Sequence, residues 1–329
     1  MSKPVTAQPV SNSSTIASAD STQLAVIGAG AWGTALADVS RRSDHQVRIW
    51  SRRGSESLAE VVQDARVILS AVSMKGVRSV VEQLQAIEIP DAVILVTATK
   101  GLDPLTKHTP SQIWQDAFPK HPVVVLSGPN LSKEIQQGRP AATVVASRDL
   151  AAAETVQELF ACETFRVYAN PDPLGTELGG TLKNVMAIAS GVCDGLSLGT
   201  NAKAALLTRA LPEMIRVGTY LGADPETFFG LSGLGDLLAT CDSPLSRNYQ
   251  VGYGLAQGKT LAEILDNLEG TAEGVNTTNV LIELANQEEI AVPISLQVHR
   301  LLRGRITPQE AVQALMARDL KSEFCDLDL

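Results

Sequence analysis

The chain has 329 residues, of which 44% are hydrophobic, 4% aromatic and 19% charged, and its formal net charge is −9. A chain of this length and apolar content can bury a large core and favours two domains. Its acidity and its few aromatic rings argue against a nucleic-acid-binding protein and against adhesion to anionic membranes. No apolar run reaches the length of a transmembrane helix, so we expect no membrane insertion.

Cysteine and histidine spacing gives no indication of a metal site. The four cysteines never form C-x-x-C, and the four histidines form neither H-x-x-x-H nor H-E-x-x-H, so we predict no bound metal. Isolated cysteines are typical of reduced, mostly structural thiols in a cytoplasmic protein. The cysteines are Cys162, Cys193, Cys241 and Cys325.

The first 22 residues predict a flexible tail. They are rich in Ser, Thr and Ala and show no apolar periodicity. They also lack the apolar region of a secretory signal, and Lys3 is their only basic residue, whereas a transit peptide carries several arginines.

The next segment predicts a strand–helix–strand unit that binds a dinucleotide. Two apolar runs, Leu24–Ile27 and Val47–Trp50, flank G-x-G-x-x-G and a helical pattern. Gly28 is expected to make the tight turn, Gly30 to let a pyrophosphate approach the backbone, and Gly33 to allow close helix–strand packing. The helix N-terminus then receives the phosphates. The alternative is an ordinary glycine-rich turn.

The end of the second strand indicates the type of dinucleotide. An NAD site usually places a carboxylate here, but this chain has Arg52 and Arg53 and no carboxylate before Glu56. A guanidinium matches a phosphate, so the sequence favours NADPH and leaves NADH possible. The alternative is two solvated arginines in a loop.

Alternation of strands and helices continues to about residue 170, which predicts a doubly wound parallel (Rossmann) sheet. From Pro171 onward we expect helices alone, because apolar residues recur at intervals of three and four. We therefore predict a dinucleotide-binding domain over residues 23–170 and a helical substrate domain over residues 171–329. The expected strands are Val67–Val72, Val93–Ala98, Val123–Leu126, Ala142–Ala146 and Phe165–Tyr168, and the helices between them are expected near Leu58–Ala65, Val77–Ala86, Ser111–Phe118, Ser132 and Leu150–Ala161.

Two loops follow predicted strands at the edge of the sheet where ligands bind in α/β folds. Lys100 follows the Val93–Ala98 strand, and Gly128 and Asn130 follow the Val123–Leu126 strand. A lysine here would face an anionic substrate in the cofactor crevice. The alternative is a surface lysine in a turn.

The helix that begins near Pro173 carries a second candidate lysine. Lys183 lies in a stripe of otherwise mostly small residues, and we expect this stripe to leave room for a ligand. Burial there would lower the pKa of Lys183 into the range useful for proton transfer. The alternative is a lysine at the edge of a helix interface. The stripe is Gly175, Gly179, Lys183, Ala187, Ser190 and Asp194.

Two further polar groups stand near predicted helix starts. Asp236 follows a glycine-rich turn, and Ser246, Arg247 and Asn248 precede a helical run. A hydroxyl, a guanidinium and an amide at a helix start can clamp a phosphate. Alone, each of these is most often a helix cap or a surface polar cluster.

The motifs together resemble those of the NAD(P)-dependent glycerol-3-phosphate dehydrogenases, most closely the bacterial biosynthetic branch. The resemblance runs from about Leu24 to the last helices and rests on the order and spacing of eight blocks. These are GAGAWGTALA, ATKGL, SGPN, GGTLKNVMAIASGVCDGL, NAKAALLTRAL, GLSGLGDLLATC, SRN and AEGV.

The resemblance implies reduction of dihydroxyacetone phosphate to sn-glycerol 3-phosphate for phospholipid synthesis, by a cytoplasmic enzyme that we expect to be a homodimer. It implies that Lys183 is the catalytic acid/base. The substrate would contact Lys100, Gly128, Asn130, Lys183, Asp236, Ser246, Arg247 and Asn248. Besides the three glycines, the cofactor would contact Trp32, Arg52, Arg53, Lys100, Ser132, Arg247 and Glu273.

The chain departs from the family pattern in two places. The family usually has a further helix and strand between the positions of Arg53 and Val67, so one sheet edge near the adenosine pocket should be shorter here. The bacterial G-P-S or G-P-T is Gly128-Pro129-Asn130 in this chain.

Two rival functions are a related β-hydroxyacid or 6-phosphogluconate-type dehydrogenase and a non-catalytic NADPH sensor. The first lacks the G-L-G-D and S-R-N blocks together. The second has no use for Lys183, Asp236 and Arg247 in one crevice.

Overall fold

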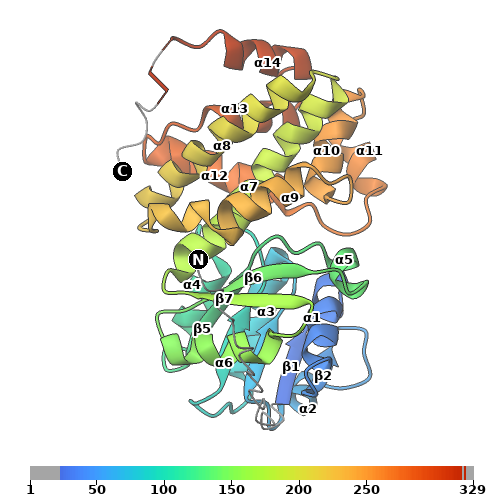
Figure 1. Cartoon of the computed structure of the whole chain (residues 1–329), viewed down its shortest axis with the longest axis vertical. Helices are drawn as coiled ribbons and strands as arrows, with labels where there is room; N and C mark the ends of the chain where they lie inside the picture. Colours follow the sequence, from blue (N-terminus) through green and yellow to red (C-terminus); the bar gives the residue numbers. More distant parts are fainter. Residues whose placement is uncertain (1–22, 321, 324–329) are drawn as a thin grey trace, which may run out of the picture.

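A computed structural model describes residues 23–320 and 322–323 of the chain. The predicted flexible tail and Cys325 lie outside these residues. Figure 1 shows a part built around a sheet and, above it, a part built of helices. The predicted fold class, a Rossmann sheet followed by a helical region, is confirmed.

The sheet has seven strands in the order β2-β1-β3-β4-β5-β6-β7. Its central strands are buried Val, Leu and Ile runs, as expected for strands that are covered on both faces. Helices α1 and α6 pack on one face, and α2, α3 and α4 pack on the other. The strands are β1 (Gln23–Ile27), β2 (Gln46–Trp50), β3 (Val67–Ser70), β4 (Ile94–Thr97), β5 (Val123–Ser127), β6 (Ala141–Ala146) and β7 (Phe165–Asn170). The helices are α1 (Ala31–Arg41), α2 (Leu58–Val62), α3 (Met74–Gln85), α4 (Pro110–Ala117), α5 (Ser132–Gln136) and α6 (Leu150–Phe160).

The last two strands correct the expectation of an all-parallel sheet. Strands β1 to β5 run parallel, but β6 pairs with β5 in the antiparallel direction, and β7 runs parallel to β6. A parallel return needs a crossover that carries the chain back across a face of the sheet. Between β5 and β6 the chain has only the five-residue α5, so the strand turns back instead.

The sheet edge that the sequence predicts to be short is formed by β2. This strand pairs with β1 alone, and the chain then enters α2 directly. Leu58, Val61 and Val62 of α2 join Trp50 of β2 in one buried cluster. Helix α2 therefore covers the end of this edge on one face.

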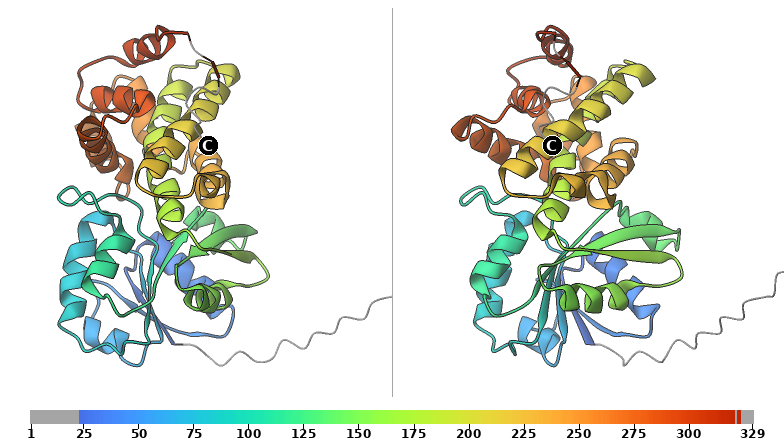
Figure 2. Two further views of the ribbon diagram at one scale, coloured as in Figure 1. Left: turned by 90° about the vertical axis from the view of Figure 1, so that its left-hand side faces the viewer. Right: turned by 60° about the vertical axis from the view of Figure 1, so that its left-hand side comes forward.

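Helix α7 connects the two parts of the molecule. It contacts β5 on the sheet side and α8, α9, α10 and α12 on the other side. The two turned views in Figure 2 show the helices after β7 gathered at one end of the sheet-containing part. The helices are α7 (Pro173–Gly195), α8 (Thr200–Tyr220), α9 (Asp236–Cys241), α10 (Arg247–Ala256), α11 (Leu261–Asp266), α12 (Glu273–Gln287), α13 (Pro293–Leu302) and α14 (Pro308–Met316), with the short turns η1 (Pro225–Phe229) and η2 (Leu231–Gly235) before α9.

Strand β7 ends at Asn170, and every named element after it in the described residues is helical. This change in structure lies where the sequence predicts the domain boundary, and the boundary itself stays a prediction. Across residues 23–320 and 322–323, none of the helices combines the length and the apolar character that crossing a bilayer needs.

Candidate active site

The glycine loop between β1 and α1 has the shape that a dinucleotide requires. Gly28 has a φ of 115°, and a methyl group there would lie 2.9 Å from the Ala71 carbonyl oxygen. A methyl group at Gly33 would lie 1.9 Å from the Gly28 carbonyl oxygen, whereas one at Gly30 would meet no described atom within 4 Å. Two glycines are therefore required by packing, and the third leaves the start of α1 open to a phosphate.

The other residues predicted to contact the cofactor lie around this loop. Trp32 is half-buried on the first turn of α1, Ser132 is the first residue of α5, and Arg52 and Arg53 are exposed in the turn after β2. Glu273 reaches across from α12, where its Oε1 accepts a hydrogen bond of 3.2 Å from the Met74 backbone nitrogen. Burial raises the pKa of the Glu273 carboxyl.

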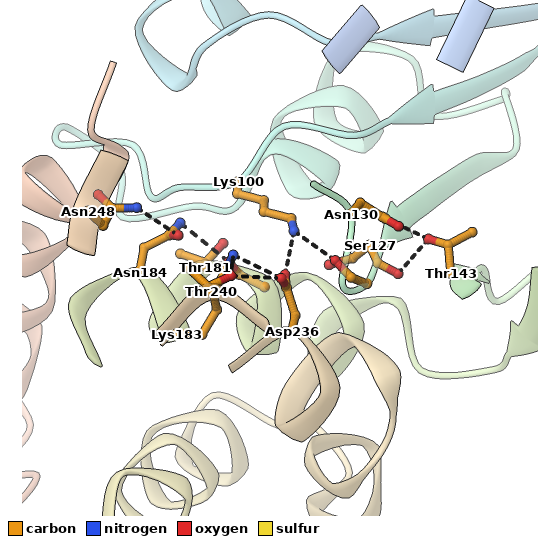
Figure 3. Close-up of polar contacts among 12 residues, drawn as sticks. Lys100, Ser127, Asn130, Thr143, Thr181, Lys183, Asn184, Asp236, Thr240 and Asn248 are labelled. Carbon is orange, nitrogen blue, oxygen red and sulfur yellow. Dashed lines mark hydrogen bonds and ion pairs between the residues drawn. The ribbon is translucent and has the colours of Figure 1, made fainter. Parts of the chain in front are cut away.

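The two lysines singled out from the sequence meet at one carboxylate (Figure 3). Lys183 Nζ donates to Asp236 Oδ1 at 2.9 Å, and Lys100 Nζ donates to Asp236 Oδ2 at 2.5 Å. Lys100 comes from the end of β4, Lys183 from α7 and Asp236 from the start of α9. The cluster therefore joins the sheet part to the helical part.

Burial and charge set the protonation of this cluster. Burial, opposed by Asp236 and assisted by the nearby Lys100 ammonium, lowers the pKa of Lys183 to about 8. Burial alone would raise the pKa of Asp236, but the two ammonium groups outweigh it and lower that pKa. At neutral pH the arrangement holds a carboxylate between two ammonium groups, one of which can release its proton near pH 8.

The small-residue stripe on α7 is filled by protein, which corrects the expectation of an open space. A methyl group at Gly179 would lie 2.8 Å from the Ser232 carbonyl oxygen, and one at Gly175 would lie 3.0 Å from Thr227 Cβ of η1. Ser190 Oγ donates to the Cys241 carbonyl oxygen at 2.8 Å. The small side chains let η2 and α9 approach α7, and this contact buries Lys183.

The loop after β5 borders the same cluster. The Gly128 carbonyl oxygen accepts from Lys100 Nζ at 3.3 Å, and Asn130 Nδ2 donates to Thr143 Oγ1 at 2.8 Å. Two buried oxygens here, Asn130 Oδ1 and Ser127 Oγ, have no hydrogen-bond partner within the described part of the chain. Unfilled buried oxygens beside an ammonium fit a site that a polar ligand completes.

Two residues at the start of α10, Ser246 and Asn248, already make hydrogen bonds within the protein. Ser246 is the N-cap of α10, and its Oγ accepts from the Tyr249 backbone nitrogen at 3.2 Å. Asn248 is buried, where it donates to Asn184 Oδ1 and accepts from the Gly274 backbone nitrogen. Arg247 is exposed on the first turn. For Ser246 the helix-cap interpretation is correct, and its hydroxyl hydrogen remains to donate to a ligand.

Two site neighbours were not predicted from the sequence. Thr240 Oγ1 lies 2.5 Å from Lys183 Nζ and 3.1 Å from Asp236 Oδ1, and Asn184 links α7 to Asn248. Thr240 stands four residues after Asp236 on α9, a spacing that puts both side chains on one helix face. This four-residue spacing is the signal in the sequence that could have indicated Thr240 as a neighbour of Asp236.

These elements define a class of protein. The Rossmann sheet has an open glycine loop at a helix start, and a buried lysine–carboxylate cluster lies beyond the carboxyl ends of its strands. This combination is typical of a nicotinamide-dependent dehydrogenase. The backbone N–H groups at the start of α1 can receive the pyrophosphate of such a cofactor, because Gly30 leaves this helix start open.

Comparison with known proteins identifies the family within that class. The family model for the NAD-dependent glycerol-3-phosphate dehydrogenase N-terminus matches residues 23–57 and 53–153, and the one for the C-terminus matches residues 172–313. The chain belongs to the NAD-dependent glycerol-3-phosphate dehydrogenase family.

Relatives extend over nearly the whole chain. It is 66% identical over 306 residues to glycerol-3-phosphate dehydrogenase [NAD(P)+] of Acaryochloris marina, covering 93% of this chain and 99% of that protein. It is 67% identical over 307 residues to the protein of the same description from Synechocystis sp., covering 93% and 97%. The crystal structure of glycerol-3-phosphate dehydrogenase from Coxiella burnetii superposes with a TM-score of 0.86 at 33% identity, covering 91% of this chain and 99% of that one.

The predicted family, reaction class and nicotinamide cofactor are thereby confirmed, and the two rival functions are not supported. The individual roles of the site residues stay predictions.

Proposed function

We propose that this dehydrogenase reduces dihydroxyacetone phosphate to sn-glycerol 3-phosphate and that Lys183 donates the proton. The observation that carries the proposal is the buried Lys183 ammonium. It lies 2.9 Å from Asp236 Oδ1, and burial lowers its pKa to about 8. An acid with a pKa near the working pH gives up a proton most effectively.

The chain's residues act on the charge that develops during reduction. When bound, the reduced nicotinamide supplies a hydride to the carbonyl carbon. As negative charge grows on the carbonyl oxygen, the Lys183 ammonium stabilises it and gives it a proton. Asp236 holds the Lys183 ammonium in place, so this proton donor needs no reorganisation during the reaction.

Groups on either side of Lys183 would orient the substrate. Arg247, with Ser246 and Asn248, would hold the phosphate at the start of α10, where a guanidinium and a helix N-terminus both favour an anion. Gly128, Asn130 and Lys100 would line the opposite side, toward the sheet. Holding the phosphate away from the reacting carbon fixes the direction of the carbonyl.

NADPH is the proposed cofactor, with NADH as a possible substitute. Residues 23–170 would bind it through the three glycines, Trp32 and Ser132, and Glu273 would reach it from α12. Residues 171–329 would bind the substrate. Arg52 and Arg53 support the choice of NADPH because they are exposed in the turn after β2, where a 2′-phosphate would lie.

We also propose that the enzyme supplies phospholipid synthesis, as the family resemblance implies, and that it acts in the cytoplasm as a homodimer. Light scattering coupled to size-exclusion chromatography measures the mass of the assembly. A monomeric mass at the enzyme's working concentration would contradict the dimer.

Loss of NADPH absorbance at 340 nm tests the function. The purified chain should oxidise NADPH with dihydroxyacetone phosphate, and it should not reduce NADP+ with hydroxyacid or 6-phosphogluconate-type substrates. A folded protein that binds NADPH and leaves the triose phosphate unchanged would refute the proposal.

A further inference from the structure

Ser127 stands at the end of β5 with a hydroxyl that the fold does not use. Its side chain is 2% exposed, and its Oγ has no hydrogen-bond partner within the described residues. Burying a hydroxyl without a partner costs free energy, so such a group in a native site calls for an explanation.

The backbone of Ser127 is firmly held. Its carbonyl oxygen accepts from Thr143 Oγ1 at 3.0 Å, and the residue pairs with Val144 in the β5–β6 register. The side chain lies against Gly180 of α7, where a methyl group would be 2.3 Å from Ser127 Oγ. The missing side chain of Gly180 therefore makes the space that the hydroxyl occupies.

The same glycine also borders Lys100. A methyl group on Gly180 would lie 3.2 Å from Lys100 Cε, so the Lys100 side chain and the Ser127 hydroxyl flank one position on α7. Figure 3 shows Lys100 and Ser127 together on the sheet side of Asp236. Rotation of the lysine side chain therefore carries its ammonium toward the unfilled hydroxyl.

Substrate binding would favour that rotation of the Lys100 side chain. An ammonium has three N–H donors, and in the described residues Lys100 uses two of them, on Asp236 at 2.5 Å and on the Gly128 carbonyl at 3.3 Å. A substrate whose oxygens approach Lys183 and Lys100 competes with Asp236 for these donors. In a buried site, an ammonium that is partly drawn from its carboxylate needs a further acceptor beside the Gly128 carbonyl.

We propose that Ser127 is a positioning residue, whose hydroxyl accepts a hydrogen bond from Lys100 in the substrate-bound enzyme and fixes the direction of that ammonium. The role is assigned by the chain's own geometry, namely an unfilled acceptor and a lysine that share Gly180. It rests on the proposed function, because it acts on the binding of the triose phosphate.

The test is a double-mutant cycle between Ser127→Ala and Lys100→Met. With Lys100 present, Ser127→Ala should raise the KM for dihydroxyacetone phosphate about tenfold, the order expected for a hydrogen bond to a charged group, with a smaller change in kcat. In the Lys100→Met background, the same substitution should change KM less than about twofold, because the two residues act as one unit. Equal effects in both backgrounds would overturn the proposal.

Two further variants separate positioning from folding. Ser40 on α1 is also fully buried with an unpartnered hydroxyl, so Ser40→Ala is a matched control that should leave the KM for the triose phosphate unchanged. Ser127→Thr keeps the hydroxyl but adds a methyl group, and Ser127→Cys keeps the size but weakens the acceptor. A KM that rises equally in Ser40→Ala and Ser127→Ala would indicate a packing effect and refute the proposal, as would a Ser127→Cys enzyme with the wild-type KM.

The wild-type enzyme in the same assay separates the two proposals. If wild type fails to turn over dihydroxyacetone phosphate, the proposed function is wrong. If wild type turns it over and the cycle shows no coupling, only the role of Ser127 is wrong.

Discussion

Two glycine-rich segments of this molecule, the loop of residues 28–33 and the first half of α7, both allow close approach, but different partners approach them. At Gly30 a methyl group would meet no described atom within 4 Å, so the approach is left to a ligand. At Gly179 the same group would lie 2.8 Å from the Ser232 carbonyl oxygen, so the approach is made by the chain itself. Small residues in a sequence thus indicate that another group approaches the backbone closely. Only the fold shows whether this group is a ligand or another segment of the chain.

The largest expected effect is at the lysine that the α7 packing buries. Lys183→Ala should lower kcat about a thousandfold, the order contributed by a positioned general acid, and leave the Kd for NADPH within about threefold of wild type. Single-turnover kinetics and NADPH fluorescence titration measure the two quantities. Lys203→Ala is the control, because Lys203 is a partly buried lysine in ion pairs with Asp194 and Asp242, outside the cluster. A similar loss of NADPH binding in Lys183→Ala would contradict the assigned role.

One substitution in each glycine-rich segment tests whether a ligand approaches residues 28–33 and the protein itself approaches α7. Gly179→Ala should destabilise the fold by about 1–3 kcal/mol, because its methyl group is overpacked against η2. Gly30→Ala should leave the unfolding midpoint nearly unchanged but raise the Kd for NADPH about tenfold or more, an effect of about 1.4 kcal/mol. Urea unfolding and cofactor titration of both variants decide the matter. If both substitutions act mainly on stability, the loop does not face a ligand.

The pH dependence of the reaction should follow the buried lysine. Since the pKa of Lys183 is about 8, kcat/KM for reduction should fall about tenfold per pH unit above that value, because the proton donor is lost. Oxidation of glycerol 3-phosphate should instead rise through the same range. Asp236 raises the Lys183 pKa, so Asp236→Asn should move the falling limb to lower pH. A limb that stays in place in that variant would argue that another group titrates.

Substitutions in the turn after β2 should have a smaller effect, which distinguishes NADPH from NADH. Replacing Arg52 and Arg53 together by alanine should raise the KM for NADPH about tenfold, since each exposed contact to a phosphate is worth about 1 kcal/mol or less. The KM for NADH should change little. Steady-state titration of both cofactors measures this, and equal changes for the two would remove the argument for a 2′-phosphate site.

A buried acid at the base of α7 should affect the pH dependence of stability and not the reaction itself. Glu177 accepts from the Ser111 backbone nitrogen at 3.0 Å, and burial raises its pKa from 4.5 to about 7. The raised pKa means that the native state favours the protonated form. Its contribution to stability, at most about 3 kcal/mol, is fully present below about pH 4.5 and is lost as the pH rises through 7.

Glu177→Gln should therefore reduce the loss of stability between pH 5 and pH 8. Urea midpoints of wild type and variant at both pH values measure it. Glu213 also has a pKa raised by burial, so part of the pH dependence should persist. Parallel curves for the two proteins would show that Glu177 does not titrate in this range.

The sequence alone was sufficient for much of this description. Local patterns predicted each strand to within a few residues, because buried strands are short apolar runs between turn-forming residues. The order of motifs indicated the family, and their places at strand ends indicated Lys100 and Lys183. The Ser232 partner of Gly179 could not be predicted, since it lies far away in the chain. The antiparallel direction of β6 was not predicted, although the short connection from β5 is the signal that indicates it.

By itself the sequence determined the Rossmann unit, the helical second half and the family, because these are written in local periodicity and in motifs of fixed spacing. Tertiary structure decided that one carboxylate, Asp236, joins two lysines from different parts of the chain, and that η2 rather than a ligand fills the space beside α7. The physical reason is that a lysine's pKa depends on burial and neighbouring charge, which are properties of the folded arrangement and of no single segment.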